Sequence, residues 1–203
     1  PFSSGDKVRA NDNITLDASD SSALGAPIKE YKWNFGNGDE ITTNESSTEY
    51  SWNLGGYYNV TLTVTDDDGE SGEITKVLQV VPEDYVDEGQ GNELVDGNED
   101  TVTYNLPVQI FVSSLQLDFT DVGCVGLGGT LSYVITLQDS SGNQIADESG
   151  NVACGETGSW SEIISNDDNE MDIGDYQVAI ELTNAGTPVQ ANWNYRFEVT
   201  YNF

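Results

Sequence analysis

Histidine is absent from the 203 residues, and only two cysteines and six basic residues are present. Because histidine is the commonest general base and the usual partner of an activated nucleophile, the main acid–base and nucleophilic mechanisms lack their central group. Carboxylate pairs can hydrolyse glycosidic bonds, but 36 acidic residues bring some pairs close by number alone. We therefore expect a protein that is not an enzyme.

The shortage of basic residues leaves a formal charge of −30. A field of that sign repels the phosphates of nucleic acids, so we expect no nucleic acid partner. Salt shortens the Debye length to about 3 Å at 1 M and thereby removes most of the self-repulsion. This excess of acidic over basic residues is typical of proteins from a halophilic, for example archaeal, or marine microbe. The alternative is the ordinary acidity of a secreted protein that binds divalent cations.

Long apolar runs are also missing, since none approaches the roughly 18 residues needed to cross a bilayer. The sequence does not start with basic residues followed by an apolar stretch. We expect no direct membrane insertion by this chain, and we expect any secretion signal or anchor to have been removed or to lie outside the sequence.

The two cysteines, Cys124 and Cys154, are expected to form one disulfide. Such bonds form in secreted β-rich proteins, and a loop of about 30 residues stabilises the fold by about 3 to 4 kcal/mol in the chain-entropy model. The competing interpretations are a metal-binding pair and a catalytic thiol. Both lack the further ligands or the base that they require.

Alternation of apolar and polar residues recurs along the chain, whereas the three-and-four spacing of helices is not sustained, which predicts an all-β protein. Residues 58–65 alternate strictly, and Asn37-Gly38 is a tight-turn dipeptide. Residues 193–203 place six apolar side chains on one face. This pattern predicts a central strand of an antiparallel sandwich with about seven or eight strands.

Residues 83–100 lose the alternation and gain acidic residues and glycine. We expect an acidic linker there, with at most a short strand near Leu94-Val95. The predicted architecture is two β-sandwich domains, in residues 1–82 and 101–203, the second with one disulfide.

Two segments in the first half resemble the PKD (polycystic kidney disease) domain, an immunoglobulin-like sandwich. Residues 31–38 read Y-K-W-N-F-G-N-G, and residues 56–66 read G-Y-Y-N-V-T-L-T-V-T-D. The family patterns that they resemble are Y-x-W-D-F-G-D-G and G-x-Y-x-V-x-L-x-V-x-D, and residues 16–22 resemble the segment before them. The resemblance covers residues 1–82 and implies an extracellular module for adhesion, spacing or assembly.

The resemblance also bears on calcium, because some PKD domains bind it with carboxylates in this region. The family usually has aspartate where this chain has Asn34 and Asn37. The remaining candidate ligands are Asp39, Asp66 and Asp68, since hard cations prefer oxygen donors.

A second acidic segment, residues 166–172, is denser in oxygen atoms. Its Asp167, Asp168 and Asp172 are further candidate calcium ligands. The alternative at both places is a solvated turn. Calcium is the only cofactor that the sequence suggests.

Exposed tryptophans can stack on sugar rings, which makes Trp52 and Trp160 candidate contacts for surface glycans because both lie near loops or strand ends. The alternative is a packing role, which we expect for Trp33.

Asn13, Asn44 and Asn59 stand in N-glycosylation acceptor motifs. A chain this rich in asparagine, serine and threonine contains such motifs by chance, so they predict a glycoprotein only weakly.

These observations lead us to expect an extracellular structural or adhesive subunit of a cell-surface layer, a filament such as a pilus, or another appendage. Its expected partner is protein, through self-association at β-edges or through the terminal strands in residues 1–10 and 193–203. One alternative is a carbohydrate-binding accessory module of a secreted hydrolase. Another is a projecting surface protein of a virus.

Overall fold

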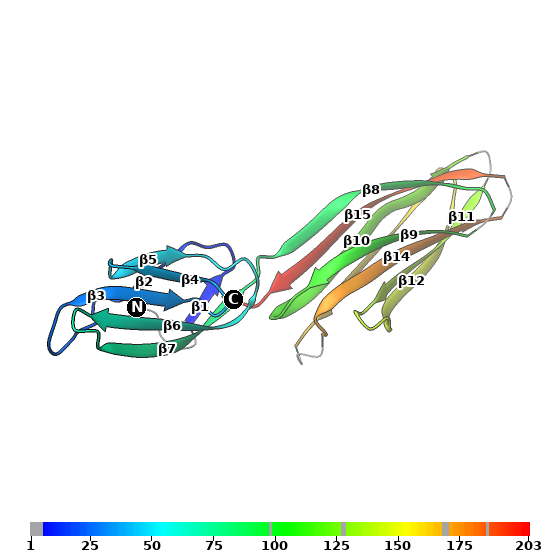
Figure 1. The fold of residues 1–203 in the computed structure, drawn as a ribbon. Coiled ribbons are helices and arrows are strands. Elements are labelled where there is room, and N and C mark those ends of the chain that lie inside the picture. The colour runs from blue at the N-terminus through cyan, green and yellow to red at the C-terminus, as the bar shows by residue number, and fades with distance from the viewer. Residues whose placement is uncertain (1–5, 98, 127–128, 168–170, 186) are drawn as a thin grey trace. The chain divides into compact units, whose positions relative to one another are not determined.

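All the secondary structure in the described part of the chain is β-strand, which confirms the all-β prediction. The chain divides into two compact units, residues 6–83 and residues 84–202, and each is described by itself. No helix able to span a membrane occurs among the described residues. The computed structural model describes residues 6–97, 99–126, 129–167, 171–185 and 187–203 (Figure 1).

The first unit is a sandwich of a five-stranded and a two-stranded sheet (Figure 1). The larger sheet has the order β1-β7-β6-β3-β4, and the smaller one pairs β2 with β5. The strands are β1 (Asp6–Arg9), β2 (Ile14–Asp17), β3 (Ile28–Asn34), β4 (Glu40–Thr43), β5 (Ser47–Tyr50), β6 (Gly56–Asp66) and β7 (Ser71–Val81).

Aromatic side chains from the resemblance segments fill the space between these sheets. Trp33 and Phe35 are 4% and 0% exposed, and Val60 and Leu62 of β6 are buried while Asn59 faces water. Asn37-Gly38 turns the chain between β3 and β4, with Gly38 at φ 101°, a conformation that glycine adopts without strain. The expected core role of Trp33 is confirmed.

The second unit is a sandwich of two four-stranded sheets, with the orders β13-β10-β15-β8 and β12-β11-β14-β9 (Figure 1). The strands are β8 (Tyr85–Val95), β9 (Asp100–Val108), β10 (Val112–Val125), β11 (Thr130–Gln138), β12 (Gln144–Ala153), β13 (Thr157–Ser165), β14 (Gly174–Asn184) and β15 (Val189–Tyr201).

The strand order of the second unit is that of a jelly roll, in which eight strands form two Greek keys. Apart from the β11–β12 hairpin, every connection crosses from one sheet to the other. In the two strand orders, β13 and β8 are the edges of one sheet, and β12 and β9 are the edges of the other. The prediction of an antiparallel sandwich with about seven or eight strands is confirmed.

The expectation of a linker over residues 83–100 is wrong. Residues 85–95 form β8, which pairs with β15 along its whole length, and β9 begins at Asp100. Glycines occupy two positions of β8 that face the core, and a Cβ atom at Gly91 would lie 2.0 Å from Cε2 of Trp193. The neighbouring strand thus supplies the apolar volume here, which removes the alternation from the sequence of β8.

The C-terminal strand β15 lies between β10 and β8 and is hydrogen-bonded to both. This confirms the predicted central strand. It also corrects the expectation that residues 193–203 are shared between subunits, because a strand paired on both sides has no edge to donate.

Candidate functional site

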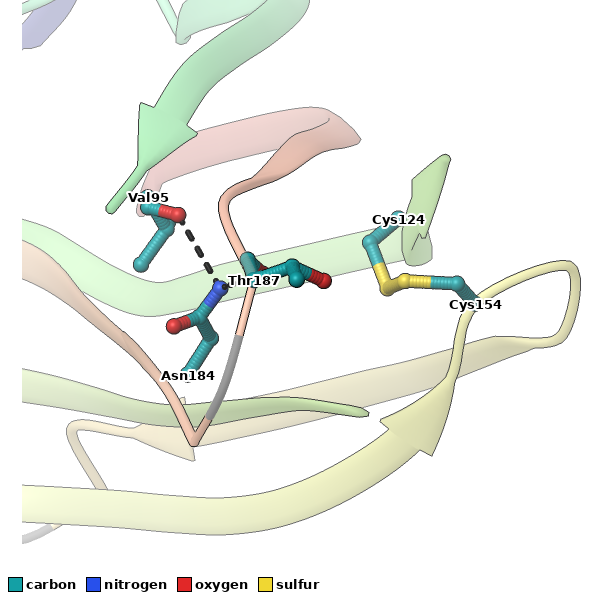
Figure 2. Close-up of a disulfide and its surroundings, with 5 residues drawn as sticks. All are labelled: Val95, Cys124, Cys154, Asn184 and Thr187. Atoms are coloured by element: carbon teal, nitrogen blue, oxygen red, sulfur yellow. Dashed lines mark hydrogen bonds between the residues drawn. A yellow bond between two sulfur atoms is a disulfide. The ribbon is translucent and has the colours of Figure 1, made fainter. Parts of the chain in front are cut away.

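The disulfide between Cys124 and Cys154 is present, as predicted, with a Cα–Cα distance of 4.6 Å (Figure 2). Cys124 belongs to β10, and Cys154 directly follows β12 of the other sheet. The bond therefore joins the two sheets of the jelly roll. Nearby, the Asn184 amide donates hydrogen bonds to the carbonyl oxygens of Val95 at 3.0 Å and Thr187 at 2.8 Å, which ties the β14–β15 loop to the end of β8.

The first set of candidate calcium ligands is not brought together. Asp39 follows β3 and accepts a hydrogen bond from the Tyr50 hydroxyl, whereas Asp66 pairs with Ile28 at the other end of β3. The seven residues of β3 span about 20 Å, and this length separates Asp39 from Asp66. Asp66 is buried, and its carboxylate accepts the backbone N–H of Glu70 at 2.9 Å, while Asp68 is exposed.

The second set lies in the loop before β14. Asp167 and Asp172 are described, whereas Asp168 lies outside the described residues. No group of three or more acidic or cysteine side chains that could hold a metal ion is found within the described ranges. Calcium binding stays a prediction.

Trp52 is 1% exposed, so the sequence-based candidate for sugar stacking is wrong at this position. Its ring packs edge-on against Phe35, and its Nε1 donates to the Phe35 carbonyl oxygen at 3.0 Å. The position of Trp52 near a strand end suggested exposure, but its indole fills part of the core of the first domain.

Trp160 is half-buried on the edge strand β13. It pairs with Phe119 of β10, and the two ring centres lie 6.3 Å apart at an interplanar angle of 26°. Because Phe119 is fully buried, the Trp160 ring covers the core at the edge of the sandwich. A role in sugar stacking stays a prediction for this residue.

The asparagines of all three glycosylation motifs, Asn13, Asn44 and Asn59, are exposed. Asn13 donates a hydrogen bond to Glu49 at 2.8 Å. Asn59 borders a polar groove of 430 Å³ on the outer face of the larger sheet, where Lys32 also lies. Exposure is a requirement of glycan attachment, and the modification itself stays a prediction.

Sequence reasoning missed a polar groove on the outer face of the β10-β15-β8 sheet, which we call the Arg196 groove. Arg196 stands opposite Asp118 on one side and Glu88 on the other, and its Nε lies 3.5 Å from Glu88 Oε2. The groove has a volume of 550 Å³, and its polar side chains are Glu88, Gln90, Asp118, Thr120, Asn194 and Arg196.

The charge in this groove is unusual because Arg196 is the one basic residue in the sequence from 84 to 203. A hydrogen bond from Arg196 to Glu198 raises the pKa of the guanidinium above its ordinary value. The signal in the sequence was the run of polar residues at alternate positions of β15, but such a run is also what any solvated face shows.

Residues 3–81 match the family model of the PKD domain, which confirms the resemblance of the first 82 residues. The first domain is thus an immunoglobulin-like PKD module, and the second is a disulfide-linked jelly roll. Among curated proteins, "Collagenase ColA" of Clostridium perfringens is 33% identical over 88 residues, which cover 42% of this chain and 8% of the collagenase.

A second relative is "Pre-pro-metalloprotease PrtV" of Vibrio cholerae, which is 43% identical over 53 residues. The match covers 26% of this chain and 6% of the metalloprotease. The chain therefore matches less than a tenth of the length of either relative.

Solved structures resemble the chain weakly. A carbohydrate-binding module of the β-sandwich superfamily gives a TM-score of 0.38 at 14% identity, covering 98% of this chain and 95% of the module. A disulfide-linked pilus of Bacillus endospore appendages gives 0.34 at 13% identity, covering 59% and 89%. The VP2 subviral particle of infectious bursal disease virus gives 0.41 at 11% identity, covering 93% and 56%. At these scores the likeness carries no conclusion about function.

Proposed function

We propose that the chain is a non-catalytic structural or adhesive subunit of an extracellular layer, filament or appendage of a halophilic or marine microbe. The observation that carries the proposal is the combination of a PKD domain with a disulfide-linked jelly roll. A disulfide persists in oxidising surroundings outside the cytoplasm. Protein is the proposed partner, including further copies of the chain.

The proposed mechanism is mechanical and interfacial. Each sandwich is packed around side chains that are almost completely buried, so it keeps its dimensions and holds neighbouring parts at a fixed spacing. The acidic surfaces approach one another when salt screens their charge. Faces and loops then form the lateral contacts.

Electron microscopy of the purified chain, in about 0.1 M and about 1 M NaCl, tests the proposal, because the Debye length falls from about 10 Å to about 3 Å. Regular filaments or lattices at the higher concentration are the expected result. Particles that remain separate monomers at both concentrations, together with no decoration of the native cell surface by antibodies, would contradict it.

A second candidate function is the binding of surface or insoluble glycans by an accessory module, and the Arg196 groove favours it. Its amide, carboxylate and guanidinium groups come from the neighbouring strands β8, β10 and β15, and groups of these types exchange hydrogen bonds with the hydroxyl groups of sugars. Retention on chitin or cellulose that is lost in Arg196→Ala is the expected result. Trp160→Ala reports whether this ring contributes, and Lys32→Ala, in the first domain, is the control.

A further inference from the structure

The edge strands of the jelly roll carry carboxylates on the side that faces the core. Residues directly opposite each other on neighbouring strands point to the same face of the sheet. Asp87 of β8 stands opposite Phe197, and Asp100 of β9 stands opposite Leu182. Both partners are 0% exposed, so these two carboxylates lie at inner-facing positions.

The other pair of edges repeats the arrangement. Glu148 of β12 stands opposite Ile135, and Glu162 of β13 stands opposite Leu117. Both partners are again 0% exposed. By register, all four edges of the second domain therefore have a carboxylate at an inner-facing position, and β8 has a second one, Glu93. Asp87, Asp100 and Glu162 are half-buried there, with one Asp100 oxygen already out of reach of water, whereas the Glu148 side chain reaches water past the open edge of β12.

Electrostatic effects on two tyrosines support the positions of Asp87 and Glu148. Tyr104 belongs to β9, in the sheet opposite β8, and burial is the main cause of the raised pKa of its hydroxyl. The charge of Asp87 adds to that increase. On the other flank, burial raises the pKa of the Tyr133 hydroxyl, and the charge of Glu148 adds to it.

A strand added at such an edge would extend the sheet over the inward carboxylate and remove it from water. Burying a carboxylate without a partner costs several kcal/mol, and inward charges are a known means of protecting sheet edges. We infer that Asp87, Asp100, Glu148 and Glu162 keep the four edges closed to strand addition by a second copy. Copies of the chain then meet through faces and loops of this domain.

This protection does not depend on low salt. Screening weakens the repulsion between exposed surfaces, but it does not restore the water lost by a buried carboxylate. A protein that assembles in brine, as the proposed function requires, loses long-range repulsion and keeps this local penalty. The expected assembly of the chain at high salt therefore rests on the proposed function, whereas the closure of the edges by the inward carboxylates does not.

The test compares two full-length variants that lose the same number of charges on one flank. Glu148→Gln with Glu162→Gln removes the inward carboxylates of β12 and β13. Asp147→Asn with Glu156→Gln is the control, because Asp147 stands opposite Thr136 on the outer face of β12 and Glu156 is exposed directly before β13. Sedimentation velocity and amide hydrogen exchange are measured in about 0.1 M and about 1 M NaCl.

We expect the inward variant to associate with a constant at least about tenfold higher than the control for each charge removed. Its β12 and β13 amides should exchange more slowly in the associated form. Asp87→Asn on β8 repeats the test on the other flank, with Asp175→Asn as its control, because Asp175 is exposed on β14 of that flank.

Equal association of the inward variant and its control would overturn the inference. Slow exchange of the β12 and β13 amides in an assembly of the unaltered protein would overturn it as well. If the unaltered protein stays monomeric in salt, the proposed function fails, while the comparison between the variants still decides the role of the edge carboxylates.

Discussion

At the scale of single residues, Gly91 controls how the aromatic side chains of the jelly roll are packed. The indole of Trp193 lies directly over it and donates a hydrogen bond from Nε1 to the Tyr104 hydroxyl at 3.0 Å. Tyr195 lies over Gly89 in the same way. A side chain at Gly91 would collide with the buried ring of Trp193, and one at Gly89 would collide with the half-buried ring of Tyr195.

Gly91→Ala should therefore destabilise the second domain by about 1 to 3 kcal/mol, the usual cost of overpacking a core. The measurement is urea unfolding, followed by tryptophan fluorescence. Gly72→Ala on β7 is the control, since nothing lies within 4 Å of the Cβ that it adds. Because alanine restricts the unfolded chain, Gly72→Ala should be neutral or slightly stabilising, and an equal destabilisation by both substitutions would exclude the collision with Trp193 as the cause.

The site residues show what sequence can and cannot predict at this scale. The disulfide was predictable because the chain offers one pair of cysteines. The burial of Trp52 was not predictable, because it depends on the carbonyl of Phe35, 17 residues earlier, which accepts the indole N–H. The Arg196 groove was not predictable either, because its side chains come from β8, β10 and β15, and the pairing of these strands depends on register.

At the scale of elements, the disulfide links β10 to the end of β12 and so joins both sheets. Cys124→Ala with Cys154→Ala should lower the free energy of unfolding of the second domain by about 3 to 4 kcal/mol for a closed loop of about 30 residues. The measurement is guanidinium unfolding with and without reductant. Reductant should destabilise the unaltered protein and leave the double variant unchanged; an effect on both would exclude this bond as the cause.

The turn between β11 and β12 should respond to acid. The Asp139 carboxylate accepts hydrogen bonds from the Asn143 side chain at 2.9 Å and from the backbone N–H groups of Asn143 and Ser141. These bonds, with the Asn143 side chain first, hold the pKa of Asp139 below its ordinary value of 3.8. A lowered folded-state pKa stabilises the protein above the unfolded-state pKa, and this contribution is lost as pH falls through the folded-state value.

Asp139→Ala should therefore reduce thermal stability modestly at neutral pH, and the two melting curves should converge as the pH falls below 3.8. Asp147→Ala, on the exposed face of β12, is the control for the loss of one negative charge. A difference between Asp139→Ala and the unaltered protein that is constant over this pH range would contradict the role of the ionised carboxylate.

Strands differed in how well their sequence predicted them. The strands β6 and β15 were predictable because one face of each is apolar and packs on its own core, so the residues alternate. The pattern failed in β8, whose core-facing positions include Asp87, Gly89 and Gly91. Edge position and rings from β15 explain these residues, and both depend on tertiary packing that a local pattern does not record.

At the scale of the whole molecule, the formal charge of −30 dominates the response to solvent. Like charges repel more strongly in the compact state than in the expanded chain, and salt screens that repulsion. We expect the thermal unfolding temperature to rise steadily as NaCl is raised from about 0.1 M to about 1 M. An uncharged osmolyte at equal osmolality is the control, and an equal rise with the osmolyte would contradict screening as the cause.

The two ends of the jelly roll chain meet at one end of the domain. Tyr85, at the start of β8, stands opposite Val199 near the end of β15, and the backbone N–H of Tyr201 donates to Asp84 at 3.0 Å. A force applied between residues 84 and 202 would therefore break the hydrogen bonds between β8 and β15 one after another, starting at Tyr85. The disulfide joins other strands and leaves this ladder unlocked. Tension along the chain would separate β8 from the sheet first. The domain is therefore better suited to positions without tension between its two ends than to transmitting such tension.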